Sequence, residues 1–186
     1  MQKCDLMESI KLKDDTTSNH CRKTAYYALK LGYSMRLNHK ELGALRVSAV
    51  LHDVGKINVP DSILFKTDIL TEREYEIVKK HSIWGEKIVA DLLTGSHSER
   101  EARFVTKIIR HHHERFDGGG YPDGLKGDKI PVYSQIIAVA DAYDAMTSNR
   151  PYRKAMDAEK AVKILKSEKG RQFRPQLIDL FVDLVS

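Results

Sequence analysis

The chain has 186 residues, a length that suits one domain with a hydrophobic core and gives no reason to expect two. Its 31 basic and 26 acidic residues leave a formal charge of +5, which favours anionic partners without choosing among nucleic acid, nucleotides and membrane surfaces. No apolar run approaches the roughly 18 residues of a membrane span, and the polar N-terminus lacks the apolar core of a secretory signal. We therefore expect a cytoplasmic protein, with Cys4 and Cys21 as reduced thiols.

The sequence predicts helix after helix. Apolar residues recur at steps of three and four, as one face of a helix requires. The clearest sets are Tyr26, Leu29, Tyr33 and Leu37 in residues 19–37, Leu42, Leu45 and Ala49 in the segment that Gly55 ends, Ala102, Val105 and Ile109, Ile137 and Ala140, and Leu177, Leu180, Phe181 and Leu184. Thr71 and Glu74 have capping-box spacing, and the apolar face after them runs to Leu92 as one helix or two.

The remaining segments are a tail and a loop. The first 18 residues lack a convincing apolar stripe, so we expect residues 1–18 to be an N-terminal tail or linker and residues 19–186 to be the folded domain. Residues 115–131 hold five of the eleven glycines and two of the five prolines, which predicts a loop of special backbone geometry. No segment alternates like a strand, so the fold class is all-α.

Histidines and carboxylates recur at the inner ends of these helices. His52 continues the face of Ala49, and His112 continues the face of Ile109. One such histidine is more often a hydrogen-bonded core residue than a ligand. The whole set favours a shared cation site over many separate exceptions. Its members are His20, His52, Asp53, His81, His112, His113 and Asp141.

Four segments together resemble the successive motifs of the HD-GYP family, whose members are helical, metal-dependent phosphodiesterases that cleave cyclic di-GMP. They are HDVGKINVP from His52, HSIWG from His81, HHERFDGGGYP from His112, and ADAYDAMTSNRPYR from Ala140. The resemblance runs from about His20 to the end of the chain. It implies a single-domain helical bundle of the HD superfamily type with a glycine-rich GYP loop.

The resemblance also implies two divalent ions, and mixed imidazole and carboxylate ligands suit iron or manganese. Asp53 would bridge the ions. The other ligands would be His20, His52 and Asp141 for one ion, and His81, His112 and His113 for the other. A bridging hydroxide would attack the scissile phosphate, and Lys56 would stabilise the charge that develops on it. Asp53 and Lys56 are the catalytic candidates.

Further residues receive binding or supporting roles. The substrate-binding candidates are Lys56, Gly120, Tyr121, Arg150 and Arg153. Gly120 would let the backbone approach a ligand, Tyr121 would pack on or hydrogen-bond to a guanine nucleotide, and the arginines suit phosphates. Among the supporting candidates, Glu114 and Asp117 would fix the loop, and Asp144 would orient a histidine or an arginine. His111 would lie next to the site or face solvent. His39 and His97 are expected to be surface residues.

Three positions depart from the family pattern. Some members hold a third ion with a glutamate where this chain has Thr16, so we prefer two ions. Arg174 stands where relatives often have an aspartate. Thr67 and Asp68 replace a Pro-Gly pair, a change that bears on the mobility of a loop near the site.

The predicted function is hydrolysis of cyclic di-GMP to linear pGpG, with GMP as the alternative final product. One alternative is a non-catalytic signalling module that binds a diguanylate cyclase or another regulatory protein. Another is an HD phosphohydrolase that acts on a mononucleotide or on another cyclic dinucleotide such as cyclic GMP-AMP. Nucleic acid is not an expected partner, because basic and aromatic residues do not interleave as in single-strand binders.

Overall fold

A computed structural model describes residues 15–149 and 154–185, with the side chains of 15–18 left out. Within these ranges the chain is helical and has no β-strand, as predicted. The helices are α2 (Asp15–Ser34), α3 (His39–Leu51), the 3-10 helix η1 (Val54–Asn58), α4 (Asp61–Leu64), α5 (Glu72–Lys79), α6 (His81–Leu93), α7 (Glu99–Arg110), the 3-10 helix η2 (Gly127–Lys129), α8 (Val132–Thr147), α9 (Ala158–Ser167) and α10 (Pro175–Val185). No helix in the described part of the chain is both long and apolar enough to cross a membrane.

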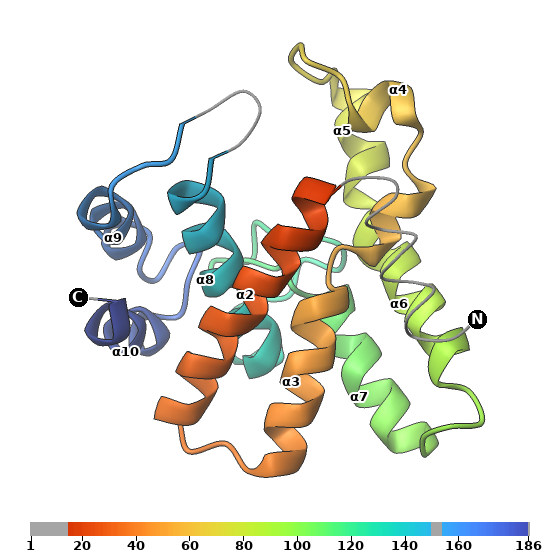
Figure 1. Cartoon of the computed structure of the whole chain (residues 1–186), viewed down its shortest axis with the longest axis horizontal. Coiled ribbons are helices and arrows are strands. Elements are labelled where there is room, and N and C mark those ends of the chain that lie inside the picture. Colours follow the sequence, from red (N-terminus) through yellow and green to blue (C-terminus); the bar gives the residue numbers. More distant parts are fainter. Residues whose placement is uncertain (1–14, 150–153, 186) are drawn as a thin grey trace.

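The helices pack around two apolar clusters. Helix α2 packs against α3 and α8, α6 packs against α7 and η1, and α3 also contacts α7 (Figure 1). The larger cluster joins α2, α3, α8, α9 and α10 with Ile108 of α7, and the smaller joins α3, η1, α6 and α7. Helix α3 contributes to both clusters, with Leu45 and Ala49 in the larger and Leu51 in the smaller. The end of α3 therefore lies where the two halves of the fold meet.

The predicted inner face of α2 was wrong. Tyr26 and Tyr33 are 56% and 66% exposed, and the buried face carries Ala25, Ala28 and Leu31 instead. Small residues face inward because the neighbouring helix comes close: a Cβ added at Gly32 would lie 2.9 Å from a methyl carbon of Leu45. Tyrosines are amphipathic, so their periodic spacing did not report burial.

The boundaries of α2 also differ from the prediction. The helix begins at Asp15 rather than Asn19 and ends at Ser34 rather than Leu37. His20 therefore lies within the second turn of α2 and does not open the helix.

The segment after Thr71 forms two helices. The Thr71 side chain accepts a hydrogen bond from the Glu74 N–H, and the Glu74 carboxylate accepts one from the Thr71 N–H at 2.7 Å, so the predicted capping box is present. Helix α5 ends at Lys79, and α6 begins at His81. The break at Lys80 places His81 at the start of a helix, where its side chain is directed towards the site described below.

Candidate metal centre

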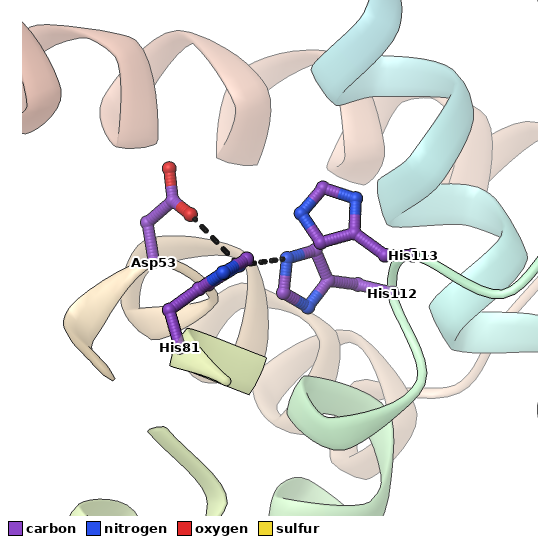
Figure 2. A group of neighbouring side chains, drawn as sticks. All are labelled: Asp53, His81, His112 and His113. Atoms are coloured by element: carbon purple, nitrogen blue, oxygen red, sulfur yellow. Dashed lines mark hydrogen bonds and ion pairs between the residues drawn. The ribbon is translucent and has the colours of Figure 1, made fainter. Parts of the chain in front are cut away.

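The seven ligand residues predicted from the sequence lie together in the structure. His20 comes from α2, His81 from α6 and Asp141 from α8, and the other members lie in the turns that follow α3 and α7. Their potential ligand atoms form two groups, each within 4.8 Å: Asp53, His81, His112 and His113 (Figure 2), and His20, His52 and Asp141. The groups adjoin, since the His52 ring lies 5.1 Å from that of His112 and 5.6 Å from that of His20.

Three of the histidines are held in the same way. In each, Nδ1 lies near the backbone carbonyl oxygen of the residue three positions earlier: 2.8 Å for His52 and Ala49, 2.7 Å for His81 and Val78, and 2.6 Å for His112 and Ile109. A carbonyl oxygen only accepts hydrogen bonds, so Nδ1 must carry the proton in all three rings. The helix ends thereby leave the lone pair of each Nε2 free to bind a cation.

These lone pairs converge in a buried space. The Nε2 atoms of His81 and His112 lie only 3.3 Å apart. Among the described residues, His52 Nε2 and Asp53 Oδ1 are buried without a hydrogen-bond partner. Facing lone pairs and an orphaned carboxylate oxygen are unfavourable unless a cation lies between them. The residues present therefore fit a divalent ion with nitrogen and oxygen ligands.

The protonation states of three histidines and of Asp53 agree with that fit. Burial lowers the pKa of His81 and His112, and it lowers the pKa of His113 to about 3, so these rings are neutral at physiological pH. Burial opposes ionisation of Asp53, but Lys56, whose Nζ lies 2.6 Å from Oδ2, and His52 hold its pKa well below its usual value. Neutral imidazoles and an ionised carboxylate are the forms that bind metal. Burial opposes protonation of His52, but the Asp53 carboxylate raises the pKa of this ring well above its usual value, so a cation bound by His52 would displace a proton.

His20 links two carboxylates. Its Nε2 lies 2.8 Å from Asp141 Oδ1, and its Nδ1 lies 2.6 Å from Asp144 Oδ2. Burial opposes protonation of the ring, yet these hydrogen bonds raise the pKa of His20 overall, and His20 in turn holds the pKa of Asp141 far below its usual value. Asp144 thus orients a histidine, as the sequence predicted.

The glycine-rich loop is fixed largely by its own residues. Glu114 accepts hydrogen bonds from the N–H groups of Asp123 and Leu125, and Asp117 accepts one from Gly119 N, so both residues fix the loop as expected. A Cβ at Gly120 would lie 2.3 Å from Arg115 N. Gly120 therefore allows the loop to approach its own backbone, whereas the sequence prediction was an approach to a ligand.

Sequence reasoning missed a clamp that joins this loop to two helices. Arg110 donates to both carboxylate oxygens of Asp123 at 2.8 and 2.7 Å and to Glu86 of α6 at 2.6 Å, and His111 Nε2 lies 2.8 Å from Asp123. His111 is thus a buried member of this clamp. His111, Glu114 and Asp123 also lie close enough to hold a cation, but the guanidinium of Arg110 already neutralises Asp123.

The HD domain family matches residues 6–177 of the chain. The chain belongs to the HD domain family. It is 38% identical over 174 residues to the cyclic di-GMP phosphodiesterase response regulator RpfG of Xanthomonas campestris, covering 94% of the chain and 45% of the relative. It is 34% identical over 180 residues to the 3′3′-cGAMP-specific phosphodiesterase 2 of Vibrio cholerae, covering 96% and 33%. The chain thus spans less than half the length of these curated relatives.

The fold has also been observed in solved structures. Bd1817, described as an HDG"Y"P protein from Bdellovibrio bacteriovorus, superposes with a TM-score of 0.71 at 23% identity, over 92% of this chain and 53% of the other. The similarity at that identity concerns the fold. Together with the relatives, it confirms the resemblance to HD-GYP proteins and the single HD domain expected from the motifs.

The remaining site candidates of this HD domain fall into two classes. Lys56 lies at the centre because its ammonium pairs with Asp53, and Tyr121 lies beside His113 with ring centroids 4.8 Å apart. Arg150 and Arg153 lie outside the described residues. His39 and His97 are exposed, as expected of surface residues.

Proposed function

We propose that this HD domain is a metal-dependent phosphodiesterase that hydrolyses cyclic di-GMP to linear pGpG and on to GMP, in the cytoplasm, with two iron or manganese ions. The observation that carries the proposal is the set of Nε2 lone pairs and the Asp53 carboxylate that converge in a buried space. The relatives named as cyclic di-GMP phosphodiesterases support the choice of substrate.

The candidate residues would divide into the ligands of two ions. The proposed ligands of one ion are His20, His52 and Asp141, those of the other are His81, His112 and His113, and Asp53 would bind both. When bound, a pair of such ions supplies Lewis acidity and lowers the pKa of bound water towards neutrality. Hydrogen bonds to Ala49, Val78 and Ile109 fix the rings, so little reorganisation would be needed during the reaction.

Lys56 is the proposed stabiliser of the phosphate. Its ammonium is held against Asp53, and its side chain is 28% exposed, so the charge is anchored beside the candidate metal ligands. An ammonium at that place would favour the extra negative charge of the transition state. Arg150, Arg153, Gly120 and Tyr121 remain proposed contacts for the nucleotide.

The test is turnover by protein purified without oxygen and loaded with iron or manganese. We expect cyclic di-GMP to be cleaved, and Asp53→Ala to reduce kcat by at least about 10³-fold, because the variant lacks the carboxylate that would bind both ions. Asp91→Asn, a change at an exposed carboxylate of α6, is the matched control and should leave the rate unchanged. Intact cyclic di-GMP after incubation with the loaded wild type would refute the proposal.

A second candidate substrate is the mixed ring of cyclic GMP-AMP, since one relative is named as specific for 3′3′-cGAMP. The two substrates share the phosphodiester and one guanine, and they differ in the other base. Parallel measurements of kcat/KM on both rings decide between them, and a higher value for the mixed ring would replace cyclic di-GMP in the proposal.

A further inference from the structure

A line of contacts leads from the candidate metal centre to helix α5. The Tyr121 ring lies 4.8 Å from His113, with an angle of 30° between the ring planes. The ammonium of Lys79 lies 5.7 Å from the centroid of Tyr121 and 5.2 Å from that of Tyr75. Lys79 thus contacts two aromatic rings, one beside the metal ligands and one on α5.

Helix α5 lies at the rim of the site. Its last residue, Lys79, comes two positions before His81, the ligand that begins α6. None of its eight residues is buried. In Figure 1, α5 lies beside α4 at the N-terminal end of α6, on the side of the molecule away from α9 and α10. A side chain on the last turns of α5 can therefore reach both the candidate centre and solvent.

Exposure distinguishes the two tyrosines. Tyr121 is partly buried and already contacts His113 and Lys79, whereas Tyr75 keeps 48% of its surface exposed. Holding a large aromatic side chain in water is unfavourable, and a flat π surface binds nucleic-acid bases with little regard to their identity. Of the two rings, Tyr75 has more open surface on which a base can stack.

Charge adds a second determinant. The side chain of Lys79 is 27% exposed, and its ammonium also pairs with Glu76, which is 64% exposed. That pair holds the ammonium between the rings but leaves it in water, where an exposed ion pair contributes little energy. An incoming phosphate can therefore displace Glu76 as the partner of Lys79.

We propose that Tyr75 and Lys79 form a subsite for one nucleotide of the substrate, with the base stacked on Tyr75 and a phosphate oxygen near Lys79. The subsite rests on the proposed function, because it takes a nucleotide whose scissile phosphate lies at the metal centre. In this arrangement Tyr75 contacts the base of that nucleotide, and Tyr121, beside His113, keeps the nucleotide contact proposed above.

The experiment compares a substrate that has bases with one that has none. Tyr75→Ala should raise KM for cyclic di-GMP at least about fivefold, the range expected from loss of one stacked base, with little change in kcat. The same variant should hydrolyse the cyclic diribose bisphosphate that lacks both bases, and hence any aromatic ring, as the wild type does. Tyr75→Phe keeps the ring and should restore KM.

Tyr26→Ala is the matched control. Tyr26 is 56% exposed, and the ammonium of Lys30 lies 5.2 Å from its centroid, so the pair on α2 has the same geometry as Tyr75 and Lys79. We expect it to leave KM unchanged. Lys79→Gln should raise KM for cyclic di-GMP and weaken its dependence on salt.

The outcomes separate this subsite from the wider proposal. If the wild type cleaves cyclic di-GMP and Tyr75→Ala leaves its KM unchanged, the subsite is wrong and the proposed function stands. If Tyr75→Ala slows both substrates equally, the residue is structural and the subsite is again wrong. A wild type that hydrolyses only the base-free ester overturns both.

Discussion

At the residue scale, the candidate centre depends on a repeated hydrogen bond. His52, His81 and His112 each place Nδ1 against the carbonyl oxygen of the residue three positions earlier. One backbone contact thereby selects the tautomer and aims the lone pair at the same time. His111, the immediate neighbour of His112, also binds a backbone oxygen, that of Lys107, but its Nε2 faces Asp123 instead of the centre.

The different environments of His111 and His112, two neighbouring residues, provide a prediction. His112→Gln should lower the metal content of iron- or manganese-loaded protein by about one ion per chain, because one of the converging lone pairs is lost. His111→Gln should keep the metal content, since His111 takes part in the Arg110 clamp. Elemental analysis of both variants after anaerobic loading provides the measurement. Equal loss of metal in both would mean that the clamp, rather than the lone pair, determines binding.

At the element scale, close approach of backbones sets the geometry of the centre. A Cβ at Gly55 in η1 would lie 1.9 Å from the carbonyl oxygen of His81 and 2.5 Å from Gly85 N. Glycine at position 55 therefore lets η1, which follows Asp53, pack directly on the start of α6. This contact helps to hold Asp53 Oδ1 3.4 Å from His81 Nε2.

Gly55→Ala should therefore lower the free energy of unfolding by about 3 kcal/mol or more, because backbone atoms, unlike a flexible side chain, cannot move aside at low cost. Gly43→Ala in α3 is the control, since nothing lies within 4 Å of its added Cβ. Alanine is the better helix former, so this change should stabilise the protein by up to about 1 kcal/mol. Urea unfolding of both variants tests the pair, and equal effects would contradict the packing argument.

The helices also show how much of the fold and of the candidate site the sequence could predict. Periodicity and capping signals located most of the helices, though not α4 or α9, and the inner helix ends indicated His52 and His112, because both are local patterns. The resemblance to the HD-GYP motifs, and not helical phase, separated His111 from the ligands beside it. The buried face of α2 was wrong, since the contact with α3 that selects small residues is tertiary. The clamp of Arg110 and Asp123 carried no local signal. Arg174, a departure of unknown effect in the sequence, donates to Gln135 of α8 at 3.1 Å and pairs with Asp128.

At the scale of the whole molecule, the candidate ligands come from both halves of the fold. His20 and Asp141 lie on helices of the larger apolar cluster, and His81 lies on a helix of the smaller one. His52 and Asp53 follow α3, which takes part in both clusters. Two ions bound by these residues, with Asp53 as a shared ligand, would therefore connect parts of the chain that are far apart in sequence and that otherwise meet along α3 and α7.

Metal removal should consequently destabilise the entire domain. An ion that binds only the native state at about 100 times its Kd adds about 2.7 kcal/mol, which corresponds to a rise in Tm of roughly 5–10 °C for a chain of this length. We expect the loaded protein to melt higher than protein stripped by a chelator, and Asp53→Asn to lose most of that difference. Calorimetry should show one transition in both states, because α3 belongs to both apolar clusters. A Tm that does not respond to iron or manganese would show that the histidines converge without binding an ion, and the proposed chemistry would then have no basis in this fold.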